Sequence, residues 1–204
     1  MTKWIENPEG GRDRGPRAMA RAWLEVLVRP GRFFRTGVAP GDQAPGLTFF
    51  MAVVLVVETT RYLTEPGVYP ALGVRFPLEM LFWLGLVVFL VAPLGLHAVA
   101  ALQTLCLLLT VDDRAGISQT VQVLAYSSAP CVLAGVAVPE LRLLCGIYAS
   151  ALLVYGLSIV HGTSLARAAV AGSIPALFLY GYGFRAVAAA TEIAVSLPLA
   201  AATP

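Results

Sequence analysis

Long apolar runs separated by short polar joints occupy most of this chain between residues 47 and 198. One helical crossing of the hydrocarbon layer of a bilayer needs about 20 apolar residues, and five of the runs approach that length. Hydrophobic residues make up 58% of the sequence and charged residues only 13%, a composition that is unusual for soluble domains. The sequence therefore predicts an all-α integral membrane protein, built as a bundle of five transmembrane helices.

The predicted spans cover residues 47–63, 78–110, 119–138, 141–160 and 165–190, within a transmembrane domain of residues 47–198. As one helix, the second span would be about 50 Å long at about 1.5 Å per residue, so it must tilt, bend or protrude from the bilayer. Pro93 is the expected position of a bend. A single bent helix is favoured over a split into two spans, which would give a six-span protein, because no polar joint accompanies Pro93.

Basic residues fall mainly on one side of the predicted spans. Most Lys and Arg precede the first span, and Arg114 and Arg167 lie in joints that return to the same side. Because basic loops are retained on the cytoplasmic side, we expect a multi-pass protein of the cell membrane with a cytoplasmic N-terminus and an external C-terminus. The net charge of +2 is then a signal of topology. Since the basic residues are spread through a juxtamembrane segment without an aromatic platform for bases, we expect no nucleic-acid partner.

Two segments precede the first span. Residues 1–16 are rich in Gly, Pro and charge and are predicted to form a flexible cytoplasmic tail. Residues 17–46 are predicted to hold an amphipathic helix, followed by a basic and aromatic juxtamembrane segment. The polar side chains of the helix recur every four residues, at Arg17, Arg21, Glu25 and Arg29, which leaves the remaining surface apolar.

The amphipathic helix has two compatible interpretations. It is expected to lie in the headgroup layer, where Arg29, Arg32 and Arg35 would meet anionic lipid headgroups. Alternatively, it packs as a lid on the cytoplasmic ends of the spans. Either way, the lipid bilayer is an expected partner of this segment.

Few ionisable residues lie at membrane depth, where they are costly and therefore informative. Glu58 and Arg61 are three residues apart on one helical face, and Arg185 reaches a comparable depth in the fifth span. Glu58 is expected to pair either with Arg61 or with Arg185. His97, with Gln103 and Gln122, forms a second possible polar group. These residues are interpreted either as ties between helices or as the pathway of a small transporter or channel that uses Glu58, Arg185 and His97.

The sequence carries no recognisable catalytic motif. No pair of a nucleophile and a base is apparent, and neither is a glycine-rich loop for phosphate. The three cysteines, Cys106, Cys131 and Cys145, stand singly in apolar runs, which is typical of small core residues and not of metal ligands. We therefore expect neither an enzyme nor a bound cofactor or metal.

The segment from Ile147 to Pro175 carries the most specific pattern: an apolar helix, a turn at a His-Gly pair, and a second helix that restarts at a Ser. Gly162 is expected to permit the turn, and Thr163 or Ser164 to cap the second helix. This segment resembles the Yip family, the Ypt-interacting multi-pass proteins of membrane trafficking. The matching residues are Gly156, Leu157, His161, Gly162, Ser164, Arg167, Ala168 and Pro175. Further similarities are the stretch from Arg29 to Phe34 before the first span, and Ala125, Tyr126 and Pro130 in the third.

The resemblance implies a non-enzymatic five-span protein that organises the membrane or binds partner proteins. Other membrane proteins, or a second copy of the chain, are the expected protein partners. It places the working surface at the cytoplasmic hairpin of His161, Gly162, Ser164 and Arg167, beside Arg29, Arg32 and Arg35. Tyr126, Pro130, Gly156 and Pro175 are expected to shape the helices. The long acidic and aromatic region of eukaryotic members has no counterpart in this sequence, which leaves a small-GTPase partner without support. The bias toward Ala, Gly, Val and Arg suggests a prokaryotic source, such as an archaeon.

Overall fold

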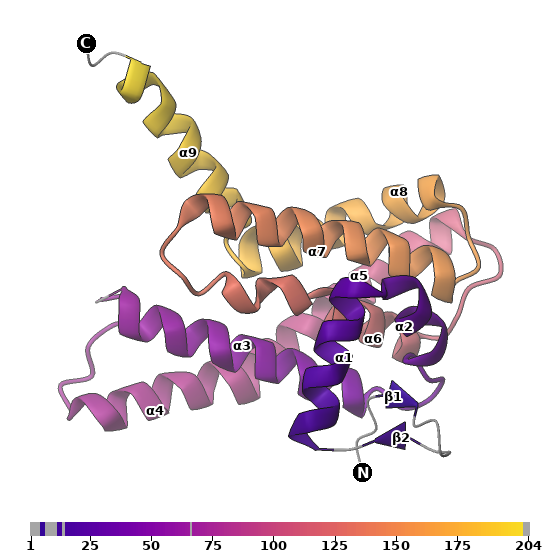
Figure 1. The fold of residues 1–204 in the computed structure, drawn as a ribbon, viewed down its shortest axis with the longest axis horizontal. Helices are drawn as coiled ribbons and strands as arrows, with labels where there is room; N and C mark the ends of the chain where they lie inside the picture. The colour runs from indigo at the N-terminus through magenta and orange to yellow at the C-terminus, as the bar shows by residue number, and fades with distance from the viewer. Residues whose placement is uncertain (1–4, 7–11, 14, 66, 202–204) are drawn as a thin grey trace.

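The computed structural model describes residues 5–6, 12–13, 15–65 and 67–201, and the side chains of residues 15–65 and 67–196. The regular secondary structure of these parts is helical, apart from an antiparallel pair of two-residue strands, β1 (Ile5–Glu6) and β2 (Arg12–Asp13). Loops join the helices. The pair lies in the predicted flexible tail, whose residues 1–4, 7–11 and 14 lie outside the described part. The long helices pack lengthwise, and the last one projects from the bundle (Figure 1).

Four helical stretches are long and apolar enough to cross a membrane. They are α3 (Ala44–Thr64), the continuous stretch Phe76–Thr110, α7 (Pro139–Val160) and the stretch Leu165–Gly183. The multi-pass helical architecture agrees with the sequence. The count of five spans is not confirmed, because the segment expected to form the third span does not reach the necessary length as one helix.

That segment forms α6 (Ile117–Ser127) and then a short 3-10 helix, η2 (Ala129–Leu133). Helix α6 has 11 residues, or about 16 Å at about 1.5 Å per residue. The break falls where the Ser128 hydroxyl donates to the Ala125 carbonyl at 2.6 Å and where Pro130 lacks an N–H for the helical ladder. Despite its shortness, α6 is central to the bundle, since every side chain from Thr120 to Ser127 is buried.

The second and last predicted spans contain wider π-helical turns. The stretch Phe76–Thr110 is made of α4 (Phe76–Leu86), the π turn η1 (Val87–Val91) and α5 (Ala92–Thr110). It is a single helical stretch, as expected, and the π turn stands directly before Pro93. Because proline cannot donate to the preceding turn, an irregularity of this kind is physically reasonable there.

The fifth predicted span, 165–190, is divided in the structure. It comprises α8 (Leu165–Ala176) and the π turn η3 (Leu177–Gly183), and a separate helix, α9 (Ala186–Ala201), follows. At the junction, Arg185 has a φ angle of 65°, in the left-handed region that residues other than glycine seldom adopt. The predicted span was therefore too long, because it continued through this junction into α9.

Two helices lie before the first span. They are α1 (Pro16–Val28) and α2 (Pro30–Thr36), and Figure 1 shows α1 crossing the direction of the long helices. Two ends of the bundle can be distinguished. We call the end with residues 111–116 and 161–164 the hairpin end, and the end with residues 64–76 and 134–139 the network end.

Candidate interaction surface and polar network

Helix α1 is docked on the bundle through one face. Its buried residues are Ala18, Ala22 and Val26, again at four-residue spacing, and each stands one residue after a member of the polar stripe, on the face beside it. The Trp23 indole N–H donates to the carbonyl of Ala129 at 2.8 Å. Helix α1 therefore packs on the bundle, against η2. Its expected position over the cytoplasmic ends of the spans stays a prediction.

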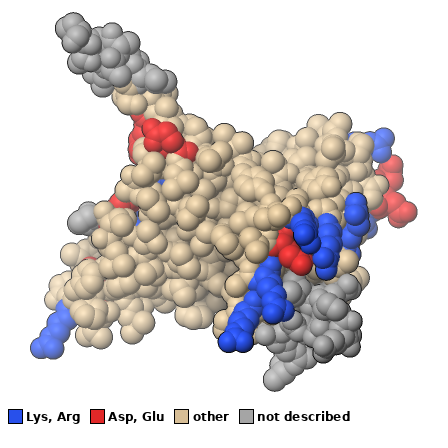
Figure 2. All heavy atoms as spheres, in the orientation of Figure 1, with Lys and Arg blue, Asp and Glu red and all other residues tan. Residues whose placement is uncertain are grey.

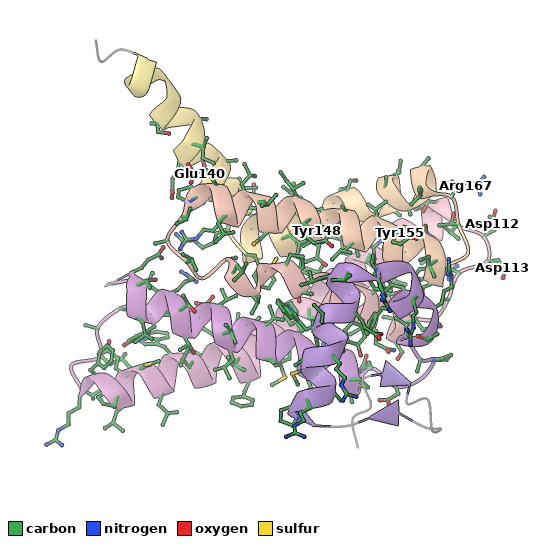
Figure 3. All side chains as sticks on the ribbon, in the orientation of Figure 1. Asp112, Asp113, Glu140, Tyr148, Tyr155 and Arg167 are labelled. Carbon is green, nitrogen blue, oxygen red and sulfur yellow. The ribbon has the colours of Figure 1, made fainter. Side chains whose placement is uncertain are left out.

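Two tyrosines of α7 lie against the junction between α1 and α2. The Tyr148 hydroxyl donates to the carbonyl of Leu27, and a Cβ atom added to Gly31 would lie 2.8 Å from the Tyr155 hydroxyl. Figure 3 labels both tyrosines along α7. The two tyrosines are two helical turns apart, so they lie on one face of α7. Their contacts with Leu27 and Gly31 hold the start of α2 close to α7.

The aromatic residues of α2 enter the core. Phe33 and Phe34 are buried, and the Phe33 ring centroid lies 4.8 Å from that of Tyr126 in a T-shaped arrangement. Gly156 makes room for this docking, since a Cβ atom there would lie 2.9 Å from both Phe34 Cζ and Val123 Cγ1. Motif positions that are far apart in the sequence thus form one packing unit.

Gln122 fastens the segment between α2 and α3. Its side-chain oxygen accepts from the Ala39 N–H at 3.1 Å, and its side-chain nitrogen donates to the Ala39 carbonyl at 2.6 Å. The structure does not bring Gln122 together with the other members of the predicted polar group. Gln103 donates to the carbonyl of Ala171 at 3.0 Å, and His97 Nδ1 lies 2.7 Å from the carbonyl of Pro93 in its own helical stretch.

His161 connects two polar joints at the hairpin end. Its side chain is buried, with the residue only 3% exposed. Nδ1 accepts from the Ala115 N–H at 3.1 Å, and Nε2 lies 3.4 Å from the Thr120 hydroxyl. Burial and then the charge of Arg114 lower the pKa of His161 to about 4. This residue therefore supports the surface from inside and does not present its ring to a partner.

The rest of the hairpin forms as expected from the sequence. Gly162 has a φ angle of 59°, which a glycine adopts without strain. Ser164 caps α8, because its hydroxyl accepts from the Arg167 N–H at 3.3 Å. Pro175 lies inside α8 and is buried.

Exposed arginines lie on this side of the protein. Arg29, Arg32, Arg35 and Arg167 are exposed, and Figure 2 shows arginine side chains gathered where α1 and α2 lie. Arg167 is at the same end as Asp112 and Asp113 (Figure 3). We call the four arginines and the docked helices that carry three of them the basic surface.

A separate group of charges connects three helices at the network end. Glu65 forms ion pairs with Arg142 and Arg185, the latter at 3.1 Å, and lies 3.8 Å from Arg61 Nε. Arg142 is only 4% exposed and also donates to the carbonyl of Ala134 at 3.0 Å. Burial alone would raise the pKa of Glu65, but hydrogen bonds and charges of Arg142 and then Arg185 lower it.

The predicted intramembrane charges have mixed outcomes. Glu58 pairs with Arg61 at 2.7 Å, which is one of the two expected pairings. Arg185 pairs with Glu65 and not with Glu58. Sequence reasoning missed Glu65 and Arg142 because both stand at the margins of their spans. One signal was available in the sequence. Glu65 and Arg142 both flank apolar runs at the same predicted depth, which favours an ion pair between them.

These features define a multi-pass helical membrane protein with an N-terminal helical pair docked on its bundle. A family model described as the Yip1 domain matches residues 24–185 of the chain. The chain therefore belongs to the Yip1 domain family, whose members are generally non-enzymatic proteins of membrane trafficking. A search of curated proteins and a search of solved structures each found no match.

Proposed function

We propose that this chain is a membrane scaffold that binds anionic lipid headgroups and partner proteins through its basic surface. In this proposal the hairpin end faces the cytoplasm of the cell, with the N-terminus inside and the C-terminus outside. The observation that carries the proposal is the docking of α1 and α2 by their apolar faces. This docking leaves Arg29, Arg32 and Arg35 exposed in a fixed arrangement.

A fixed arrangement of arginines supports binding for an energetic reason. The planar guanidinium group of arginine can donate two parallel hydrogen bonds to phosphate or carboxylate oxygens. A rigid element loses less conformational entropy on binding than a mobile tail does. Because Trp23, Phe33 and Phe34 anchor the helical pair, much of this ordering is complete before a ligand arrives.

Exposed apolar side chains of α1 favour a lipid surface as one ligand. Leu24 and Val28 are 55% and 66% exposed, next to the arginines of the polar stripe. Apolar side chains beside basic ones are typical of helices that lie at the boundary between headgroups and acyl chains. Each basic residue near an anionic leaflet contributes about 1 kcal/mol of attraction.

The alternative function, a small transporter or channel, has weaker support. Glu58 is paired with Arg61, Arg185 with Glu65, and His97 bonds within its own helical stretch. The three residues therefore do not form one polar path. An ion or metabolite flux in liposomes that is lost in Glu58→Gln would restore this alternative.

The test compares wild type with a variant that has Arg32, Arg35 and Arg167 changed to alanine. Arg75→Ala is the matched control, because Arg75 is also exposed but precedes α4 at the network end. Each protein is crosslinked in its native membrane and purified, and its bound proteins and retained anionic lipids are identified by mass spectrometry. We expect wild type and the control to retain a defined partner and anionic lipids, and the triple variant to lose both. Equal retention by all three proteins would refute the proposal.

A further inference from the structure

A pocket of about 370 Å³ lies at the network end, between the end of α3 and the start of α4. Its walls include the rings of Tyr62, Tyr69 and Phe76 and the carboxylates of Glu65 and Glu79. The helix α3 ends at Thr64 and the next span begins at Phe76. The pocket therefore lies where two spans end, at the level of a membrane boundary and its lipid headgroups.

The aromatic walls combine one angled contact with two stacked contacts. The centroids of Tyr62 and Phe76 are 5.4 Å apart with their planes at 61°. Tyr62 stacks on Tyr69, and Tyr69 stacks in turn on Trp83, with centroid distances of 5.7 Å and 5.2 Å. Aromatic faces carry partial negative charge and attract cations, above all quaternary ammonium groups.

Glu79 adds a full negative charge to this wall. Both of its oxygens are held by neutral donors, the Tyr62 hydroxyl at 3.0 Å and the Leu72 N–H at 3.2 Å. No Lys or Arg in the described part of the chain forms an ion pair with Glu79. Glu65, in contrast, is balanced by Arg142 and Arg185. An oriented carboxylate without a cationic partner, beside aromatic rings, favours a cation as the occupant.

We propose that this pocket binds a quaternary ammonium group, either as the headgroup of a choline lipid or as a free molecule. Tyr62 and Phe76 receive the methyl groups of the cation, Tyr69 supports Tyr62 by stacking on it, and Glu79 supplies the opposite charge. The pocket lies at the opposite end of the bundle from the basic surface. Its test therefore succeeds or fails independently of the proposed scaffold function.

The experiment uses the full chain in nanodiscs of phosphatidylglycerol, which contain no choline. Binding of choline is measured at equilibrium and compared with that of 3,3-dimethyl-1-butanol, a neutral molecule of the same shape. We expect saturable binding of choline and at least about tenfold weaker binding of the neutral molecule, because only the cation meets Glu79 and the ring faces favourably. Absence of saturable choline binding, or equal binding of the two molecules, would overturn the proposal.

Two variants and one control locate the binding. Glu79→Gln removes the charge and is expected to weaken choline binding by about tenfold, and Tyr62→Leu removes a ring face and is expected to weaken it by at least about fivefold. Phe89→Leu is the control, because Phe89 is 73% exposed on the same helical stretch and does not line the pocket. Melting curves are recorded for each protein to show that it is folded. Unchanged affinity in both folded pocket variants would refute this site.

A final comparison identifies the source of the ammonium group. The choline titration is repeated in nanodiscs of phosphatidylcholine. If the lipid headgroup is the ligand, it competes and the apparent affinity for free choline falls. If a free molecule is the ligand, the affinity is the same in both lipids.

Discussion

Gly156 is the position where one added methyl group tests the docking of the N-terminal helices most directly. In Gly156→Ala, the new Cβ atom would lie 2.9 Å from Phe34 Cζ and 2.9 Å from Val123 Cγ1. Phe34 is buried between α2 and α7, so its ring has little room to retreat. We expect the methyl group to displace α2 from α7 while the spans remain folded.

The magnitude follows from overpacking. Extra methyl groups in a well-packed core cost about 1–3 kcal/mol, but an alanine in a helix is intrinsically about 1 kcal/mol better than a glycine. Gly95→Ala in α5 isolates the second effect, since a Cβ atom at Gly95 meets no other atom within 4 Å. The difference between the two variants should therefore be about 1–3 kcal/mol, or about a 5- to 150-fold change in the open fraction of the docked pair.

Limited proteolysis measures this opening. Trypsin cleaves after Arg32 and Arg35, which are exposed but lie in the docked helix α2. We expect Gly156→Ala to be cleaved about 5- to 150-fold faster than Gly95→Ala. Adding Phe34→Leu to Gly156→Ala should bring the cleavage rate part of the way back to that of Gly95→Ala. Equal cleavage of the two alanine variants would show that α2 does not depend on the close approach at Gly156.

Three further predictions concern polar residues. Folding lowers the pKa of His161 from 6.5 to about 4, so the folded state favours the neutral ring. Up to about 3 kcal/mol of folding stability should therefore be lost as the pH falls from 6.5 to 4. In melting curves recorded over this pH range, His161→Gln should flatten the dependence. Glu65→Gln should cost about 3–5 kcal/mol, because it leaves the buried guanidinium of Arg142 without a counter-charge, and an unchanged melting temperature would contradict this role. Gln122→Leu should cost about 1–3 kcal/mol and raise hydrogen exchange at Ala39, whereas unaltered exchange there would show that Gln122 does not hold this segment.

The sequence predicted the helical membrane class and most of the span positions because hydropathy and helix length are local properties. It failed at residues 119–138, where apolar composition continues through a break that Ser128 and Pro130 produce in the backbone. It failed again near Arg185. This residue has a left-handed backbone conformation that separates two helical stretches, although the sequence on both sides is apolar. An apolar run indicates that its residues are buried in lipid or protein, but it does not indicate where a helix ends.

The candidate site was predicted in parts for a similar reason. Glu58 and Arg61 were paired correctly because a spacing of three residues determines a shared helical face. Glu65 follows α3, Arg142 lies in α7 and Arg185 stands at the junction before α9. Their meeting depends on the rotation and depth of these segments, which cannot be read from local sequence patterns. His161 was assigned to the surface because it stands in a turn, but the neighbouring joint covers it. The prokaryotic source and the expected lipid and protein partners stay predictions.

The docking of the N-terminal pair has a consequence for how the protein is made. Phe33, Phe34 and Trp23 are synthesised before every span, yet their partners Tyr126, Ala129 and Gly156 belong to segments made much later. At about 5–20 residues per second, the pair waits roughly ten seconds on the ribosome before α7 completes its binding place. Its docking can therefore be completed only after α6, η2 and α7 have been made, and it marks the chains in which these three segments are in place.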